Sequence, residues 1–351
     1  MTTRHRVLLA DAVAASAALA ERLKDSACYV TGASGFLASS LIAFLSELDR
    51  VYQVGLRLFA SARRPSAEVR LFPFLGIQPR VEWVIATTEE AKLPAVGNLI
   101  VVHAASYGSP KNYLRDPIAT FSANTLGLIN LLRGAGGGQV RQLVFFSSAE
   151  VYGQPPPEAI PTAENYQGTM DTLSVRSIYG ESKRMGEVLG TCLAEKAGIP
   201  LTIVRPWNLY GPGQRWDDGR VPIEFLRQAL QERTIRLASN GSPRRAFCFA
   251  WDGIRQIAAT LGLSGKVLAF NIGNGTEEIS ILGLAQSCAT ACGLPESAVW
   301  YDPAARALGL QRCLPEVSAV LRLTPGRLDF TPLSVGLPLL VEWLDFLTPD
   351  A

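Results

Sequence analysis

A glycine-rich turn near the N-terminus constrains the fold of this chain more than any other feature. Residues 27–30 form a short apolar run that predicts a strand, and residues 41–48 predict a helix. Between them stands Thr31-Gly32-Ala33-Ser34-Gly35-Phe36-Leu37-Ala38. Glycines three residues apart at such a junction let the backbone turn tightly and approach a pyrophosphate at the helix N-terminus. We therefore expect a dinucleotide site here, with contacts from Gly32, Ser34, Gly35, Phe36 and Leu37.

Strand-like and helix-like segments alternate along the first part of the chain. Further apolar runs lie at residues 54–60, 81–85, 99–102, 142–146 and 201–204. This alternation predicts an α/β fold with a doubly wound parallel sheet. We expect an N-terminal extension helix at 1–25, a dinucleotide-binding Rossmann domain at 26–205 and a smaller mixed substrate-binding lobe at 206–351. Within that lobe, about 250–272 is expected to return to the sheet.

Composition excludes several classes of function. The 351 residues carry a net charge of +2, which lacks the basic excess of nucleic-acid-binding proteins. The chain holds two histidines and six scattered cysteines, so neither a zinc site nor histidine-based catalysis is expected. No apolar run approaches membrane-spanning length, and the alanine-rich N-terminus lacks the form of a signal peptide. We expect a cytoplasmic protein without a metal and without nucleic-acid or membrane partners.

Two short stretches carry candidate catalytic residues. Ser148 follows the apolar run 142–146, so it would emerge at the carboxyl end of a buried strand, where ligands bind in open α/β sheets. Tyr179 and Lys183 lie four residues apart in a helix-like segment, which places the phenol and the ammonium on one helix face. A lysine held near a tyrosine favours the phenolate and lowers the pKa of the phenol. The alternative is an exposed tyrosine–lysine pair with no catalytic role.

The residues after the second predicted strand bear on the phosphate of the cofactor. Where an acidic residue would hold the adenosine ribose of NAD, the chain has Arg63 and Arg64. Arginine can pair with the 2′-phosphate of NADP. Both side chains could equally stack on adenine or face solvent, so NAD and NADP both stay open.

The motifs together resemble the extended short-chain dehydrogenase/reductase family, in its nucleotide-sugar epimerase/dehydratase branch. The resemblance runs from about residue 27 to about residue 343. It rests on the segments 31–38, 103–106, 147–153, 179–183, 205–214 and 245–252, together with Asn124. Independent motifs in a fixed order are specific for a family and much less specific for one reaction.

The resemblance implies a role for each motif. Tyr179 would take the proton of the sugar 4-hydroxyl while NAD takes the hydride from C4, with Lys183 on the nicotinamide ribose and Ser148 on O4. Further cofactor contacts are implied for Arg63, Ala104, Ala105 and Asn124. Substrate contacts are implied for Ser106, Tyr113, Ser148, Asn208 and Arg245. His103 is expected to be a packed residue at a strand end. The family also implies a nucleotide-diphosphate sugar as substrate and a homodimer built on helices near 113–132 and 178–196.

The run Ser148-Ala149-Glu150 bears on the reaction that follows oxidation at C4. Sugar 4,6-dehydratases use an aspartate directly after the catalytic hydroxyl residue, and Ala149 cannot donate a proton. UDP-glucuronate decarboxylases carry a hydroxyl residue, a small residue and then glutamate, so the chain most resembles them, with Glu150 as a candidate catalytic residue. Its departures from that pattern are the missing acid after the second strand and Trp207 with Pro206 in the substrate loop.

Several other readings stay open. A nucleotide-sugar 4-epimerase is the first alternative to a decarboxylase. A 4,6-dehydratase, a net NADPH-dependent 4-keto-sugar reductase and a non-catalytic relative follow. Glu150 itself could order the loop near Tyr152 without touching a substrate.

Overall fold

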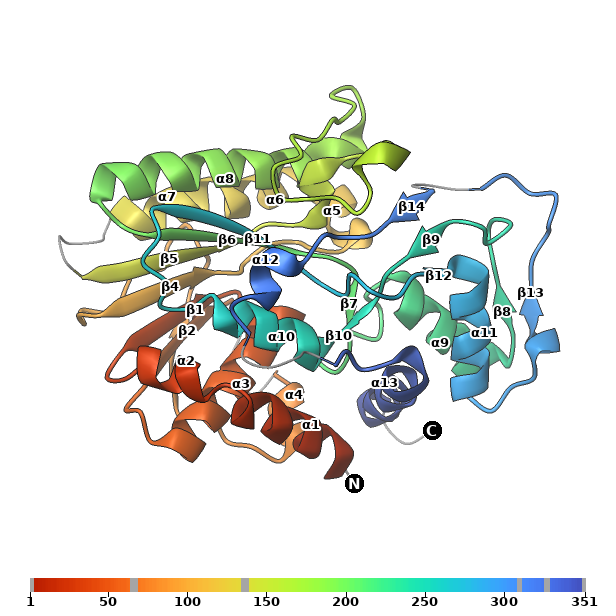
Figure 1. The fold of residues 1–351 in the computed structure, drawn as a ribbon, viewed down its shortest axis with the longest axis horizontal. Coiled ribbons are helices and arrows are strands. Elements are labelled where there is room, and N and C mark those ends of the chain that lie inside the picture. Colours follow the sequence, from red (N-terminus) through yellow and green to blue (C-terminus); the bar gives the residue numbers. More distant parts are fainter. Residues whose placement is uncertain (1–2, 64–68, 134–138, 308–310, 325–328, 349–351) are drawn as a thin grey trace.

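A seven-stranded parallel sheet forms the centre of the computed structural model, which describes residues 3–63, 69–133, 139–307, 311–324 and 329–348 (Figure 1). The strand order is β11-β6-β5-β4-β1-β2-β3, and every neighbouring pair is parallel. The strands are β1 (Ala27–Thr31), β2 (Arg57–Ala62), β3 (Val81–Ile85), β4 (Leu99–His103), β5 (Val140–Phe146), β6 (Leu201–Pro206) and β11 (Val267–Ile272). The chain starts in the middle of the sheet and winds outward to both edges, so the predicted doubly wound α/β class is confirmed.

The central strands are buried on both faces. β1 and β4 are buried along their whole length. Tyr29 and Val101 pack into the core on one face of the sheet, whereas Val30 and Val102 pack into the core on the other. Because successive side chains of a strand point to opposite faces, double burial requires the continuous apolar runs seen in the sequence.

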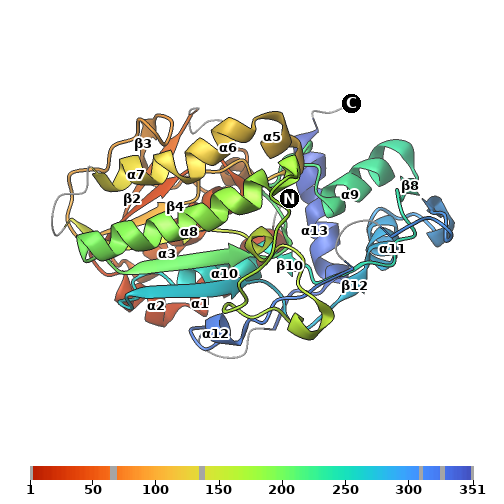
Figure 2. The ribbon, with the colours of Figure 1, turned by 90° about the horizontal axis from the view of Figure 1, so that it is seen from above.

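Helices cover both faces of the sheet (Figures 1 and 2). One face carries α6 (Pro117–Asn124), α7 (Leu126–Arg133) and α8 (Ile178–Ala197), preceded by the short α5 (Pro110–Arg115). The other face carries α3 (Phe36–Tyr52) and α10 (Ala250–Ala259), with α4 (Leu71–Leu75) beside α3. Two N-terminal helices, α1 (Thr3–Ala14) and α2 (Ala17–Arg22), pack on the outside of this second layer, against α3 and α10.

A smaller lobe lies at one end of the sheet (Figures 1 and 2). Its helices are α9 (Val221–Glu232), α11 (Ile281–Ala291) and α13 (Leu333–Leu347). The short α12 (Ser318–Leu321) packs instead against α10 and β11, beside the main sheet. Its strands are the two-residue pieces β7 (Leu209–Tyr210), β8 (Ile235–Arg236), β9 (Arg244–Arg245), β10 (Cys248–Phe249), β12 (Ile279–Ser280), β13 (Val299–Trp300) and β14 (Arg312–Cys313). Between these pieces the chain leaves the lobe to form α10 and β11, and β11 pairs in parallel with β6.

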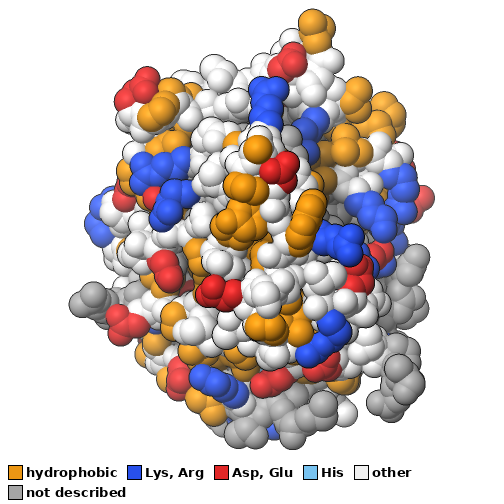
Figure 3. Space-filling view, turned by 90° about the vertical axis from the view of Figure 1, so that its right-hand side faces the viewer, with side chains coloured by type: hydrophobic (Ala, Val, Ile, Leu, Met, Phe, Trp, Pro, Cys, Tyr) orange, Lys and Arg blue, Asp and Glu red, His pale blue; other side chains and the backbone are white. Residues whose placement is uncertain are grey.

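The outer face of the lobe is mixed in character. Figure 3 shows hydrophobic side chains there interspersed with Lys, Arg, Asp and Glu. No helix among the described residues is both long and apolar enough to cross a bilayer. The expected cytoplasmic location stays a prediction.

Candidate active site

A cavity of about 950 Å³ lies between the sheet and the lobe. Its sheet side is formed by the residues that follow β1, β2, β4, β5 and β6, which is the edge where the carboxyl ends of parallel strands meet. Its lobe side is formed by α9, by the residues after β8 and by β9. All of the predicted site residues line this cavity except Asn124.

The glycine-rich turn has room for a ligand only because its first glycine lacks a side chain. Gly32 has a φ of +66°, and a Cβ at this position would lie 2.6 Å from the Cα of Ala105. Gly35 then caps the N-terminus of α3, which opens toward the cavity. Backbone amides at a helix N-terminus are suited to a phosphate. This cradle fits the pyrophosphate of a dinucleotide.

Thr31 ties the ends of β1 and β4 together beneath that cradle. Its Oγ1 accepts hydrogen bonds from the backbone amides of Ala104 and Ala105, each at 3.1 Å, and donates to Nδ1 of His103 at 3.0 Å. Nε2 of His103 donates to the carbonyl of Ala123 at 2.9 Å. Burial lowers the pKa of His103 to about 3. His103 is therefore a neutral, packed residue at a strand end, as expected.

Asn124, an expected cofactor contact, does not line the cavity. It is fully buried. Its Nδ2 donates to Oγ of Ser182 at 2.8 Å, and that hydroxyl donates to the carbonyl of Tyr179 at 2.8 Å. The amide nitrogen of Asn124 thus supports the first turns of α8, whereas its Oδ1 is buried without a hydrogen-bond partner among the described residues. The cofactor contact of Asn124 stays a prediction.

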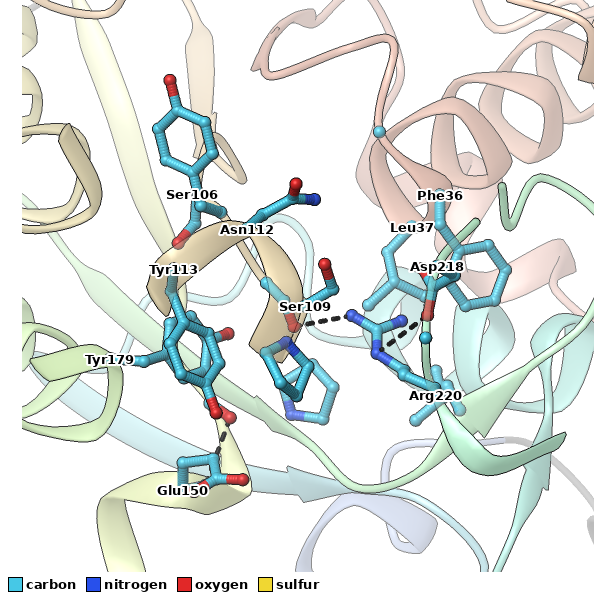
Figure 4. A pocket seen from close by; sticks show the side chains of 18 of the residues that line it. Phe36, Leu37, Ser106, Ser109, Asn112, Tyr113, Glu150, Tyr179, Asp218 and Arg220 are labelled. Atoms are coloured by element: carbon cyan, nitrogen blue, oxygen red, sulfur yellow. Dashed lines mark hydrogen bonds and ion pairs between the residues drawn. The ribbon is translucent and has the colours of Figure 1, made fainter. Parts of the chain in front are cut away.

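Ser148, Tyr179 and Lys183 all line the cavity, as the sequence predicts. Figure 4 shows Tyr179 there, with its ring beside that of Tyr113. Ser148 and Tyr179 are each 9% exposed and Lys183 is 2% exposed, so the alternative of an exposed pair on a solvated helix is wrong. Oγ of Ser148 accepts a hydrogen bond from the backbone amide of Glu150 at 3.1 Å. Nζ of Lys183 donates to the carbonyl of Phe146 at 2.5 Å. Burial lowers the pKa of Lys183 to about 7.

The pKa of Tyr179 differs from the expectation. Burial raises it above the ordinary value, and Lys183 is not among the groups that lower it. The lowering influences are the charge of Arg220 and a hydrogen bond with Ser148. Tyr113 stacks on Tyr179 with ring centroids 5.1 Å apart and an interplanar angle of 10°. Desolvation outweighs the neighbouring cations because it acts on the whole buried phenol.

Arg220 is a site residue that the sequence reasoning missed. It stands in the segment just before α9, and its Nη2 donates to the carbonyl of Gly108 at 2.9 Å (Figure 4). Its Nε lies 3.5 Å from Oδ1 of Asp218. The charged run Arg215-Trp216-Asp217-Asp218-Gly219-Arg220 was the available signal. Arg176 and Arg215 also line the cavity.

The proposed substrate end of the cavity is rich in polar groups. Within the described part of the chain, the hydroxyls of Ser106 and Ser109 are buried without a hydrogen-bond partner. Nδ2 of Asn208 donates to the carbonyl of Ala246 at 3.1 Å. Nη1 of Arg245 donates to the neighbouring carbonyl of Arg244 at 2.8 Å. The unpartnered hydroxyls are available to a ligand.

Glu150 is exposed at the cavity, in the 3₁₀ turn Ala149–Tyr152 that follows β5. Among the described residues its carboxylate has no hydrogen-bond or ion-pair partner. Its charge raises the pKa of Tyr113, Tyr179 and Arg245. The turn is capped by the hydroxyl of Ser148 and not by this carboxylate, so the alternative of a loop-ordering role finds no contact here.

Arg63 lines the other end of the cavity, after β2. Its Nη1 donates to the hydroxyl of Tyr107 at 2.6 Å, and its guanidinium carbon lies 5.0 Å from the centre of that ring. Arg64, the second arginine of the prediction, lies outside the described residues.

Comparisons with known proteins agree with this geometry. A model of the NAD dependent epimerase/dehydratase family matches residues 28–273. UDP-glucuronic acid decarboxylase 1 of Xenopus tropicalis is 33% identical over 177 residues, which cover 50% of this chain and 41% of that protein. UDP-glucuronic acid decarboxylase 6 of Arabidopsis thaliana is 29% identical over 248 residues, which cover 71% and 69%. The chain thus spans less than half the length of the Xenopus relative.

Solved structures share the fold. UDP-glucuronic acid 4-epimerase from Bacillus cereus, in complex with UDP-glucuronic acid and NAD, superimposes with a TM-score of 0.73 at 20% identity. The match covers 92% of this chain and all of that one. UDP-glucose 4-epimerase from Thermotoga maritima, with UDP-glucose, gives a TM-score of 0.72 at 19% identity, covering 91% and 98%. At these identities the likeness supports the architecture alone.

Proposed function

This chain belongs to the NAD dependent epimerase/dehydratase family, and we propose that it is an enzyme that decarboxylates a nucleotide-diphosphate hexuronic acid, with UDP-glucuronate as the substrate. The observation that carries the proposal is the convergence of Ser148, Tyr179 and Lys183 in one cavity that begins at the Gly32 cradle. The named relatives support the substrate class.

The residues of the cavity fit a bound NAD. Gly32 to Leu37 would hold its pyrophosphate, Arg63 would border its adenosine, and Ala104 and Ala105 would lie beneath it. Lys183 would reach its nicotinamide ribose. When bound, the cofactor would accept a hydride from C4 of the sugar and later return it.

The chain's own groups would manage the protons. The phenol oxygen of Tyr179, once deprotonated, would take the proton from the 4-hydroxyl while Ser148 donates a hydrogen bond to O4. The resulting 4-ketone makes a hexuronic acid a β-keto acid, in which the bond between C5 and C6 breaks with loss of CO₂. The electrons left on C5 are delocalised onto O4, where Ser148 and Tyr179 stabilise the negative charge.

Ala149 supports decarboxylation over loss of water. Elimination across C5 and C6 needs an acid for the leaving hydroxyl, and alanine offers none. Loss of CO₂ from a β-keto acid needs no such acid. Glu150 would then face the substrate with a carboxylate that takes up a proton from solvent, and we assign the resulting carboxyl group the role of delivering that proton to C5.

A 4-epimerase is the second candidate, and the arginines of the cavity favour it. Arg176 and Arg220 line the cavity, and Arg220 approaches Tyr179. A cation paired with the sugar carboxylate would stabilise it and so oppose loss of CO₂. An enzyme that keeps the carboxylate would return the hydride to the other face of C4.

One incubation separates these reactions. The purified protein with NAD⁺ and UDP-glucuronate should yield a product lighter by one CO₂ in mass spectrometry. An unchanged mass with a new sugar in the NMR spectrum would instead establish the epimerase, and loss of water would establish a dehydratase. Stoichiometric consumption of added NADPH with a 4-keto sugar would establish the reductase. Tyr179→Phe is the control, and its retention of full activity would contradict every catalytic reading.

A second copy of this chain is the partner that the surface favours. Six exposed apolar side chains form what we call the α5–α8 surface: Leu114, Ile118, Phe121, Leu126, Met185 and Val188. Their exposed fractions run from 40% to 74%. Apolar side chains gathered on neighbouring helices are typical of an interface. We assign this surface to a homodimer.

A further inference from the structure

A buried ion pair lies behind the candidate catalytic residues, outside the cavity lining. Nε and Nη2 of Arg205 donate to the two carboxylate oxygens of Glu187 at 2.8 and 2.7 Å. The side chains of Glu187 and Arg205 are only 14% and 11% exposed. Such pairs add little net stability, because the loss of hydration offsets the attraction between the charges. The position of this pair therefore calls for a different explanation.

Helix α8 forms hydrogen bonds with two consecutive residues at the end of β5, Phe146 and Ser147. Nζ of Lys183 donates to the carbonyl of Phe146, and Oγ of Ser147 donates to Oε1 of Glu187, both at 2.5 Å. Lys183 and Glu187 are one helical turn apart on the same face. The residue that follows this double attachment is Ser148.

Arg205 holds the other end of the segment 147–152, at Tyr152. Its Nη1 donates to the hydroxyl of Tyr152 at 2.7 Å and to the carbonyl of Glu164 at 2.8 Å. Tyr152 ends the 3₁₀ turn that carries Glu150. Its hydroxyl donates in turn to Oδ1 of Asn271 on β11 at 2.7 Å. Arg205 belongs to β6, so its guanidinium links the segment 147–152 to that strand. Through Glu187 the same guanidinium also links the segment to α8.

We infer that Glu187 and Arg205 are positioning residues that hold the segment 147–152 against α8, so that Ser148 and Glu150 face Tyr179 and Lys183. The inference rests on the proposed catalytic roles of Ser148, Tyr179 and Lys183. Neither Glu187 nor Arg205 touches the cavity, so they act through the residues that they hold.

The carboxylate of Glu187 also acts on the charge of Lys183. Burial lowers the pKa of Lys183 to about 7, and Glu187 opposes that effect. The other titratable groups near the ammonium are Tyr179, whose ring centre lies 5.9 Å away, and His103, whose own pKa is lowered by Lys183. Glu187 itself faces Arg205 and Ser147. Without the carboxylate, Lys183 would lose its proton at a lower pH.

NADH binding across a range of pH tests this inference without requiring turnover. Lys183 lines the cavity, and its ammonium favours an anionic dinucleotide, so affinity should fall as pH rises through its pKa. In Glu187→Gln the midpoint of that fall should move to lower pH by roughly one unit. With a substrate that the protein turns over, kcat should drop roughly tenfold with a much smaller change in KM.

Two further variants distinguish loss of the Glu187 charge from general destabilisation of the fold. Glu187→Gln leaves Arg205 buried and unpaired, so the double variant E187Q/R205Q should melt at a higher temperature than the single one. The double variant should still show the lowered pH midpoint of NADH binding, because the carboxylate of Glu187 is absent. Glu195→Gln is the matched control, an exposed glutamate on the same helix, and should behave as the unaltered protein.

The outcomes are separable. A double variant with the unaltered midpoint and unaltered kcat would overturn the inference, and so would a midpoint shift in Glu195→Gln as large as in Glu187→Gln. Failure of the unaltered protein to convert any nucleotide sugar would count against the proposed function. The comparison of NADH binding midpoints would still decide the role of Glu187.

Discussion

Opposing influences act on Tyr179. Burial is the largest and raises its pKa, whereas the charge of Arg220 and the hydrogen bond with Ser148 lower it. Tyr113 lies flat against one face of the ring, which limits its rotation. A phenol must lose its proton before it can act as a base, so this balance sets the pH at which the proposed reaction begins. Arg220 should therefore matter through its charge as well as its contacts.

Replacement of Arg220 by glutamine should move the acidic limb of the pH–rate profile to higher pH. The arginine charge lowers the pKa of Tyr179, so its removal raises that pKa and leaves less phenolate at neutral pH. A rise of about one unit would cost roughly tenfold in rate below the pKa. Arg215→Gln is the matched control, because Arg215 lines the same cavity but is exposed and paired with Asp217. An acidic limb that stays in place in Arg220→Gln would contradict this account.

Replacement of Arg63 tests whether this residue recognises the 2′-phosphate that distinguishes NADP from NAD. Its guanidinium is held at the cavity edge by Tyr107, where it could pair with a 2′-phosphate. In Arg63→Ala, binding of NADP⁺ measured by calorimetry should weaken roughly tenfold, while binding of NAD⁺ should change much less. Tyr107→Phe keeps the charge and serves as the control. Equal losses for both cofactors would mean that Arg63 does not read this phosphate.

At the scale of elements, α8 places its groups by lying close to β5. A Cβ on Gly186 would lie 2.3 Å from the ring of Phe145, so a larger residue would push the helix outward. The short separation lets Lys183 reach the carbonyl of Phe146. Packing distance, as well as helical spacing, thus decides that Tyr179 and Lys183 face the cavity.

The turn between β1 and α3 also requires a glycine, Gly32, at a point of close backbone approach. Gly32→Ala should abolish most NAD⁺ binding and lower the melting temperature, because the new Cβ would meet the backbone of Ala105, whose amide is bonded to Thr31. Gly198→Ala is a close control: its φ of +67° carries the same backbone strain, but a Cβ there has no neighbour within 4 Å. That strain costs about 1–2 kcal/mol. Equal loss of NAD⁺ binding in both variants would show that strain, and not space, governs the turn.

Part of the site follows from local pattern and part does not. Gly32, Ser148 and Tyr179 lie within or directly after regular strand and helix patterns, so their spacing predicts that they share one edge of the sheet. Arg220 reaches Tyr179 through the packing of the lobe against the sheet, which no local period encodes. Asn124 shows a third case. Its helix could be predicted, but the direction of its side chain depends on a hydrogen bond to Ser182, far away in sequence. The two-residue strands of the lobe likewise depend on tertiary pairing.

At the scale of the whole molecule, apolar side chains emerge on the side opposite to the N-terminal helices. Helices α6 and α8 pack on each other over one face of the sheet, while α1 and α2 lie beyond the other (Figures 1 and 2). Ile118 on α6 is 74% exposed and Val188 on α8 is 58% exposed. A two-fold axis through the α5–α8 surface would bring this surface of one copy against the same surface of another.

The double variant I118K/V188K should convert the proposed homodimer to a monomer. Both side chains are exposed in one copy, so lysine can be accommodated without disturbing its core, and circular dichroism should stay unchanged. In a dimer, each lysine would place an unpaired charge in an apolar contact. Light scattering during size-exclusion chromatography would give the mass of each species. Ile85→Lys, on the edge strand β3 and 55% exposed, should leave the dimer intact. A monomeric unaltered protein would contradict the proposed homodimer, and a dimer broken equally by Ile85→Lys would place the interface elsewhere than on the α5–α8 surface.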